Sequence, residues 1–218
     1  MERYFTLDKY NTWADWGLIV TAKDTTPPEP KTNYVDIEGR DGTLDLTEAL
    51  TGGVTYGDRT VSASFWTCEG SRKDRERRIR EIISTLHGRK IKIIEPDDLT
   101  HYFVGRVNIS GVNNHLAYST FDFEAVCEPW RYAIDESVRT VAVSNTEAEA
   151  IVYNNGVKTL CPDIAVSGSI NLTYPGISVN TLTTGNYKIS DLKLYRGANT
   201  IGISGNGTIA FVYREGDL

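Results

Sequence analysis

The stretch Ser71–Gly88, SRKDRERRIREIISTLHG, is the part of this chain that has the periodicity of a helix. Ser71 can cap the helix with Asp74 at the third helical position, an arrangement typical of a capping box. Gly88 suits the position just after a helix end. Four apolar residues recur at i, i+3, i+4 and i+7 and share one face: Ile79, Ile82, Ile83 and Leu86. We therefore predict one helix, roughly over residues 72–87.

The segments on both sides of this helix have the period of two that is typical of half-buried strands. Apolar residues alternate with polar ones over 61–65, and isoleucines resume a strand over 91–94. Residues 102–127 predict a long hairpin with its turn at Asn113 and Asn114. A hairpin of this length often reaches toward a neighbouring molecule. The fold class predicted for this half is α+β, a β-barrel or sandwich with one helix.

Residues 40–50, RDGTLDLTEAL, carry a pattern that contains no catalytic chemistry. Asp41 followed by glycine favours a turn, because glycine adopts a positive φ without a steric penalty. Leu44 and Leu46 are separated by polar residues, so they suggest anchor points rather than a continuous strand. Residues 56–59, Tyr-Gly-Asp-Arg, follow without a nucleophile, a metal-ligand spacing or a phosphate loop. We interpret the segment as a surface that fits against another molecule.

From residue 138 onward the sequence consists of short strand patterns between turn signals, with no helical period. This spacing is typical of a small antiparallel sandwich, so the whole chain is predicted to be mainly β. We place the domain boundary so that the domains are 1–133 and 134–218. The predicted strands are 138–144, 149–153, 164–173, 177–182, 186–189, 192–195, 199–204 and 208–213.

The composition excludes several classes of protein. The 218 residues carry a net charge of −6, which argues against a general binder of nucleic acid or anionic membranes. The sequence shows no apolar run long enough for a membrane span, and its first residues do not resemble a signal peptide. Cys68, Cys127 and Cys161 are odd in number and far apart, so we expect buried, inert thiols in a reducing cytoplasm rather than disulfides.

Several motifs, in this order and spacing, resemble the distal tail proteins of long-tailed bacteriophages. They cover nearly the whole chain, and each is weak when taken alone. In the first half they are residues 40–47, residues 56–59 before a strand, the helix that ends at 86–88, and Glu128-Pro129-Trp130-Arg131-Tyr132. In the second half they are residues 153–156, Pro162, residues 197–201 and the terminal YREGDL at 213–218.

The resemblance implies a structural virion protein that forms a homohexameric ring at the tail tip. The ring would join the tail tube to the adsorption apparatus and leave a channel for DNA. Its implied partners are other copies of itself, the tail tube protein and the tail-associated hub protein, with tape-measure and receptor-binding proteins as further candidates. A galectin-like sandwich is implied for the second domain, which at 134–218 has no room for the long insertion that some members use to hold receptor-binding proteins. Assembly would take place in the cytoplasm of the bacterial host.

We expect the surfaces that contact other subunits to lie on the proline-rich loop 25–32, the 40–50 segment, the helix and the hairpin tip. The helix carries six basic residues, for which three interpretations stay open: a solvated face, an intersubunit salt-bridge belt, or DNA contact. Arg72 and Arg75 project toward its apolar side and would need carboxylate partners if covered. The candidate interface residues are Pro27, Pro28, Asp41, Leu44, Leu46, Arg59, Arg72, Arg75, Arg78, Asn113 and Asn114.

Other clusters give no clear chemistry, so we expect no cofactor, no metal and no catalysis. The carboxylates of residues 95–98 favour a solvated turn, with calcium binding as the alternative. His87, His101 and His115 have no partner at metal-ligand spacing. Two other functions fit the sequence less well. A small enzyme lacks any assembled nucleophile, acid or metal set, and a carbohydrate-binding module that assists adsorption would need exposed tyrosines or tryptophans in a shallow groove.

Overall fold

The computed structural model describes residues 4–218, apart from the side chain of Asn180. The predicted mainly β class is confirmed, with one helix among antiparallel sheets. The chain divides into two compact units: the first runs to Arg131, together with Leu218, and the second runs from Tyr132 to Asp217. Within residues 4–218, no helix has the length and apolar character needed to cross a lipid bilayer.

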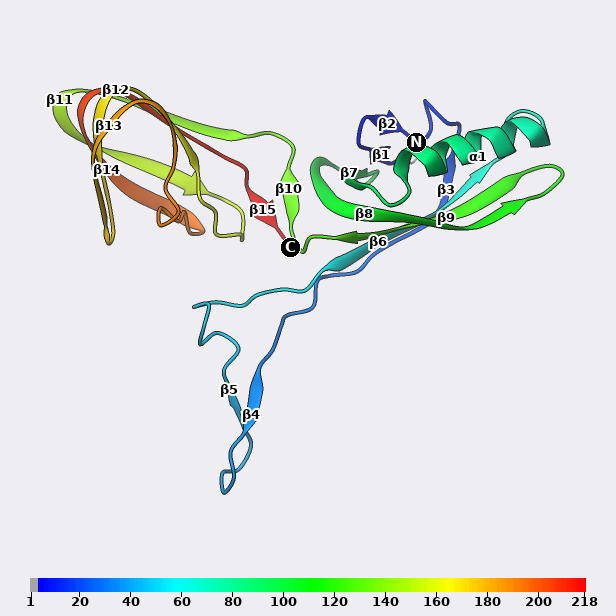
Figure 1. The fold of residues 1–218 in the computed structure, drawn as a ribbon, viewed down its shortest axis with the longest axis horizontal. Helices are drawn as coiled ribbons and strands as arrows, with labels where there is room; N and C mark the ends of the chain where they lie inside the picture. The colour runs from blue at the N-terminus through cyan, green and yellow to red at the C-terminus, as the bar shows by residue number, and fades with distance from the viewer. Residues whose placement is uncertain (1–3) are drawn as a thin grey trace. The chain divides into compact units, whose positions relative to one another are not determined.

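The first unit is built on one antiparallel sheet with the strand order β2-β1-β7-β8-β9-β6-β3. Helix α1 (Arg72–Leu86) lies over one face of this sheet, against β8 and β9 (Figure 1). A separate two-stranded sheet pairs β4 (Tyr34–Asp36) with β5 (Thr43–Asp45). The strands of the main sheet are β1 (Thr6–Leu7), β2 (Tyr10–Asn11), β3 (Ile19–Thr25), β6 (Arg59–Thr67), β7 (Lys90–Glu95), β8 (Asp98–Asn114) and β9 (Ser119–Cys127).

The core of the first unit lies between α1 and the sheet. Every second residue of β6 and β9 faces it, which is why their buried and exposed positions alternate. Phe65 stands edge-on to Phe123, with 6.2 Å between ring centroids. The helix contributes Ile79, Ile82 and Leu86, which are almost completely buried. The opposite face of β6 and β9 carries mainly small and polar side chains.

The helix predicted from the sequence is confirmed, and it ends one residue earlier than expected. The Ser71 side chain accepts a hydrogen bond from the Asp74 N–H, and the Asp74 carboxylate accepts one from the Ser71 N–H, so the capping box is complete. Gly88 follows the helix end with φ at +75°. Both hydrogen bonds satisfy N–H groups that the first turn of a helix leaves without partners.

We expect Ser71→Ala to lower the free energy of unfolding of the first unit by about 1 kcal/mol, because the substitution removes the side-chain half of the cap. Ser84→Ala is the matched control. Ser84 lies in the same helix, and its hydroxyl donates only to the Glu81 carbonyl. Urea unfolding followed by circular dichroism measures both variants, and equal losses would contradict the role given to the cap.

The long hairpin is confirmed, but the predicted position of its turn is wrong. Asn113 and Asn114 still pair with Thr120 and Ser119 as part of the ladder. The loop begins one residue later, where the His115 N–H donates to the Tyr118 carbonyl. A register shift between Ser110 and Asn113, beside Gly111 at φ +60°, lets β8 extend past the asparagines.

The second unit is a four-stranded antiparallel sheet with the order β11-β14-β12-β13. Its strands are long, so the prediction of eight short strands is wrong. The breaks predicted at 145–148, 183–185 and 205–207 lie inside continuous strands, and the predicted strand 192–195 contributes only the isolated bridge between Leu160 and Leu194. The main strands are β11 (Ser137–Asn154), β12 (Asp163–Tyr174), β13 (Ile177–Lys188) and β14 (Gly197–Tyr213), and the short strands β10 (Arg131–Ala133) and β15 (Gly216–Asp217) pair with each other.

A fold line crosses this sheet where glycines of neighbouring strands meet. Gly168 of β12 pairs with Gly207 of β14, and both have positive φ. β11 has a register shift between Ser144 and Thr146 at the same level. The halves on either side of the line contribute to one buried cluster, since along β14 Ile203 precedes Gly207 and Phe211 follows it. The sheet therefore bends over its own core.

Candidate assembly surface

An extended arm, residues 26–58, leaves the main sheet between β3 and β6. Its two short strands pair near the tip, with Val35 opposite Leu44. Every residue from 31 to 42 is exposed, and so is Leu50, whose side chain is 94% accessible. A two-stranded hairpin without a core to pack on has little stability in water. The arm therefore has the exposed apolar character of a segment that another surface covers.

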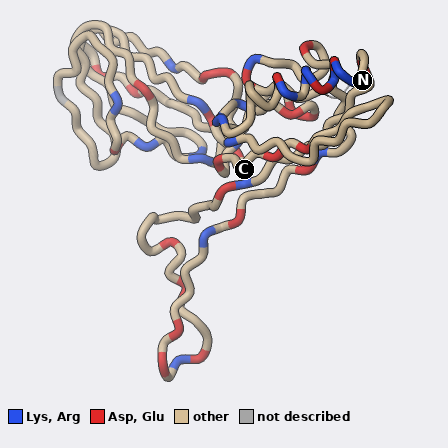
Figure 2. Tube along the Cα trace, turned by 45° about the vertical axis from the view of Figure 1, so that its right-hand side comes forward, with Lys and Arg blue, Asp and Glu red and all other residues tan. Residues whose placement is uncertain are grey.

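The arm extends from the side of the sheet opposite to α1 (Figure 1). Acidic residues predominate along it (Figure 2). It contains seven carboxylates and two basic residues, Lys31 and Arg40. In the part of the chain that the structure describes, none of these carboxylates forms an ion pair. The Asp45 pKa lies below its ordinary value because the Thr47 side chain and backbone donate hydrogen bonds to its carboxylate.

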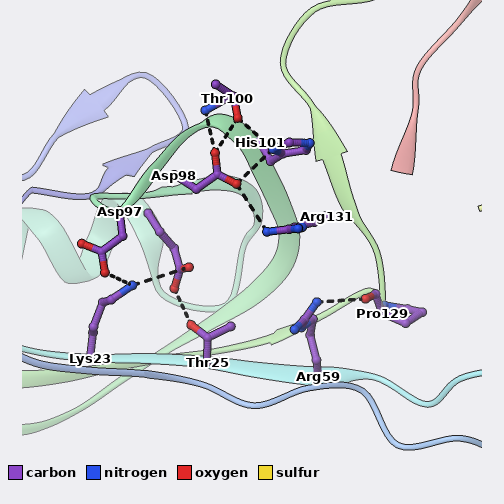
Figure 3. A network of polar contacts seen from close by, with 10 residues as sticks. Lys23, Thr25, Arg59, Asp97, Asp98, Thr100, His101, Pro129 and Arg131 are labelled. Carbon is purple, nitrogen blue, oxygen red and sulfur yellow. Dashed lines mark hydrogen bonds and ion pairs between the residues drawn. The ribbon is translucent and has the colours of Figure 1, made fainter. Parts of the chain in front are cut away.

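The root of the arm is held by Arg59, which is 7% exposed (Figure 3). Its Nε donates to the Thr26 carbonyl at 3.1 Å, where the arm begins, and its Nη1 donates to the Pro129 carbonyl at 3.2 Å. The guanidinium also lies over the Phe103 ring, 4.8 Å from its centroid. Burial lowers the pKa of Arg59, although an arginine stays charged at neutral pH. These contacts fix the direction in which the arm leaves the sheet.

Ion pairs beside the root connect β3 to the turn between β7 and β8 (Figure 3). Lys23 lies 2.8 Å from the Asp97 carboxylate and 3.7 Å from that of Glu95. Glu95 also accepts a hydrogen bond from the Thr25 hydroxyl. The carboxylates of the 95–98 segment therefore contact protein groups of the first unit. Among the described residues, no group of three or more acidic, histidine or cysteine side chains could hold a metal ion.

Asp98 is the most connected of these carboxylates. It accepts hydrogen bonds from the Thr100 N–H at 3.0 Å and the Thr100 hydroxyl at 2.6 Å, and it lies 3.0 Å from His101 Nδ1 and 3.5 Å from Arg131. Partial burial raises the pKa of Asp98, whereas the bonds from Thr100 and the charge of His101 lower it. The balance leaves the pKa below its ordinary value.

A carboxylate with a lowered pKa stabilises the fold at pH values above its unfolded-state pKa of about 3.9. That contribution is lost as the pH falls through the lower folded-state pKa. We expect Asp98→Asn to lower the thermal midpoint at pH 7 and to approach the unmodified protein at the lowest pH values. Thermal unfolding between pH 7 and pH 2.5 measures this. A constant difference between the two proteins over that range would contradict the expectation.

Helix α1 presents its basic residues in two ways. Lys73, Arg77 and Arg80 are exposed on the face turned away from the isoleucines. Arg75 is 2% exposed, and its partners are not the carboxylates that the sequence led us to expect. It donates to the carbonyls of Gly70, His115 and Leu116 at 2.7, 3.2 and 2.9 Å and to the Ser119 hydroxyl at 3.3 Å. Arg75 therefore ties the hairpin loop to the start of the helix.

The predicted interface residues fall into three groups. Pro28, Arg59 and Arg75 are buried inside the first unit and therefore present no surface to another subunit. Pro27, Asp41, Arg72 and Asn113 are exposed, whereas Leu44, Leu46, Arg78 and Asn114 are half-buried. Arg72 lies 3.0 Å from Glu76 within the helix, and Arg78 lies 3.6 Å from Glu69.

Sequence reasoning missed the exposed apolar residues of the arm and of the hairpin loop. Tyr34 is 58% exposed, Ile37 43% and Leu116 87%. Besides the pattern of residues 40–50, the sequence carried a second signal for the arm, the excess of carboxylates over residues 29–58. No comparable signal was available for Leu116, because its exposure depends on where the hairpin turns.

The prediction of buried cysteines is wrong for Cys68, which is exposed just after β6 ends at Thr67. Cys127 is buried, and burial raises the pKa of its thiol to about 12. Cys161 is half-buried, and its thiol donates to the Ile189 carbonyl. All three are free thiols.

Two comparisons with known proteins found matches, and both matches are to phage proteins. Residues 16–122 match the family model described as the phage tail protein RIFT-related domain. A solved structure similar to the chain is that of the SPP1 Dit (gp 19.1) protein, described as a paradigm of the hub adsorption apparatus in phages that infect Gram-positive bacteria. The TM-score is 0.72 at 16% identity, over 98% of this chain and 99% of that one.

The resemblance to phage distal tail proteins that the motifs indicated is confirmed by these two findings. At 16% identity the structural match shows a shared fold. A search of curated protein sequences found no match.

Proposed function

We propose that this protein is a structural subunit of a bacteriophage tail tip and that it assembles into a homohexameric ring. The observation that carries the proposal is the shared fold with a tail hub protein over nearly the full length of both chains. The phage tail domain at residues 16–122 supports the same role. The protein would act by assembly, without catalysis and without a cofactor.

In this role the ring joins the tail tube to the adsorption apparatus and leaves a channel through which DNA passes. Its partners are the tail tube protein, the tail-associated hub protein and, beyond these, tape-measure and receptor-binding proteins. The net charge of −6 supports a conduit that does not hold DNA, because tight binding to phosphates requires clustered basic residues. The exposed apolar arm supports assembly, because ring-forming contacts bury surfaces of this kind.

Light scattering combined with negative-stain imaging tests the ring. We expect a particle with six times the mass of the 24.3-kDa chain and a central hole. A single 24.3-kDa species at every concentration would contradict self-assembly. Gold-labelled antibodies against the protein, applied to intact virions, test its place: label at the tail tip supports the proposal, and label along the tube or on the head contradicts it.

A further inference from the structure

We propose that the outer face of the second unit binds a neutral saccharide chain. The site is a hollow that lies over β14 between β11 and β12 and continues along these strands toward two exposed tyrosines. Its volume is about 450 Å³, which is within the range of sites that hold small ligands. Binding of this kind would be a function beyond assembly, and it does not depend on the ring proposed above.

Strand register brings the lining residues of the hollow together on one face of the sheet. Glu149 of β11 pairs with Gly202 of β14, and Gly202 pairs with Thr173 of β12. Glu147 and Ser204 form the next outward-facing pair along β11 and β14. Every second residue in this part of β11 faces outward, since the positions between them pack on the core. Five residues from three strands therefore surround one hollow.

Gly202 forms the floor of the hollow, and its backbone conformation does not require a glycine, because its φ is not positive. Glycine inside a strand weakens the strand and often marks a place where a ligand approaches the backbone closely. A Cβ at this position would lie 2.3 Å from the Thr173 hydroxyl oxygen, and every other neighbouring atom is at least 3.6 Å away. The floor is therefore bounded by a hydroxyl group that can rotate, which leaves room for a ligand above the backbone of β14.

The side chains around the hollow suit the hydroxyl groups of an uncharged ligand. Glu147 and Glu149 are exposed and form no ion pair among the described residues, so their carboxylates can accept O–H donors. Hydrogen bonds to an ionised acceptor are stronger than those between neutral groups. In the described part of the chain, none of the residues that line the hollow is basic. Two carboxylates repel an anionic ligand, so the site favours neutral saccharides over acidic sugars.

Two exposed tyrosines lie beyond the hollow and offer flat surfaces for sugar rings. Tyr153 is 56% exposed on the outward face of β11, four residues from Glu149 or about 13 Å along the strand. Tyr195 is 57% exposed and lies just before β14 begins at Gly197. A tyrosine ring is apolar with a polar tip, which suits a ligand that is partly hydrated. A site of this length fits a chain of sugar rings rather than a single ring.

A buried asparagine holds the turn that carries Tyr195 against β11. Asn199 is 5% exposed, and its Nδ2 donates to the Tyr195 carbonyl at 2.7 Å and to the Val152 carbonyl at 3.3 Å. Its Oδ1 accepts from the Tyr195 N–H at 2.9 Å. Val152 directly precedes Tyr153, so the backbone of both exposed tyrosines is fixed by the same buried side chain. A surface that is ordered before binding loses less entropy when a ligand binds.

Two substitutions in the full chain, Glu149→Gln and Tyr153→Ala, test the site. The probes are cellotetraose, maltotetraose and chitotetraose as neutral chains and tetragalacturonate as an acidic chain. We expect at least one neutral chain to bind with a Kd of about 1 mM and the acidic chain to bind more weakly. Glu149→Gln should raise this Kd by about 10-fold, because a charge-assisted hydrogen bond is lost. Tyr153→Ala should raise it by about 5-fold. Isothermal titration calorimetry and saturation-transfer NMR measure these values.

The matched controls are Glu124→Gln and Tyr34→Ala, both in the first unit. Glu124 is an exposed carboxylate on β9, and Tyr34 is 58% exposed. Both controls should bind the neutral chain like the unmodified protein, and equal thermal midpoints show that all variants fold. The proposal is overturned if no neutral chain binds at concentrations up to about 10 mM, if tetragalacturonate binds as tightly, or if either site variant binds unchanged. The proposed ring is unaffected by each of these results, because its test is the mass of the particle.

Discussion

Gly168→Ala should unfold the second unit or lower its free energy of unfolding by roughly 3–5 kcal/mol, because strain and a steric clash add together. Gly168 has φ at +102°, a conformation that residues with a side chain rarely adopt. A Cβ at this position would lie 2.3 Å from the Asn206 carbonyl oxygen and 2.8 Å from the Gly207 Cα. Both are backbone atoms of the neighbouring strand, so neither can move without disturbing the fold line.

Gly176→Ala is the matched control for this prediction. Gly176 also has positive φ, at +80°, but a Cβ there would meet nothing within 4 Å. The control isolates the backbone penalty, which is about 1–2 kcal/mol. Urea unfolding monitored by tyrosine fluorescence separates the two variants. Equal losses would show that the close approach of β12 and β14 contributes nothing, and the account of the fold line would fail.

Arg75→Met should lower the free energy of unfolding of the first unit by about 3–5 kcal/mol, because it removes a buried guanidinium that donates to four acceptors, and each charged hydrogen bond contributes about 1 kcal/mol. The methionine fills most of the volume of the arginine stem, so the loss reports the missing guanidinium. Three backbone carbonyls, those of Gly70, His115 and Leu116, lose their partner at once. The hairpin loop should then exchange its amide hydrogens faster, which hydrogen–deuterium exchange measures.

Arg72→Met provides the comparison for Arg75→Met within the same helix. Arg72 has a side chain that is 53% exposed, and its one ion pair is with Glu76 in the next turn. Its loss should change the free energy of unfolding by no more than about 0.5 kcal/mol. A similar effect for both arginines, or unchanged exchange in the 115–118 loop after the Arg75 substitution, would contradict the tie between helix and hairpin.

The periodic elements could be predicted from the sequence. The helix has an amphipathic repeat and a capping box, both of which are local signals, and the strands of the hairpin alternate regularly over many residues. The strands of the second unit were harder to predict, because Gly205-Asn206-Gly207 is typical of a turn and also of a bend inside a strand. The choice between them depends on whether Gly168 of another strand lies opposite, which is a long-range fact.

The candidate assembly surface could also be predicted only in part, because it too depends on contacts between distant residues. The interest of residues 40–50 could be inferred from their pattern, but the sequence did not show that they belong to an arm that leaves the sheet. Arg75 was expected to need a carboxylate partner. Two of its partners are backbone carbonyls that lie 40 and 41 residues away, and no sequence pattern indicates such partners. Arg59 was predicted to lie in an interface. Its role at the arm root could not be predicted, because it depends on a bond to Pro129, which is 70 residues away in the sequence.

The fixing of the arm root by Arg59 has a consequence for the size of the proposed ring. In a closed assembly of identical subunits, the rotation from one copy to the next determines how many copies complete the circle. If arms join neighbours, that rotation depends on the angle at which each arm departs, and the bonds from Arg59 to Thr26 and Pro129 hold this angle. The buried side chain of Arg59 would thereby help to set the number of subunits in the proposed ring.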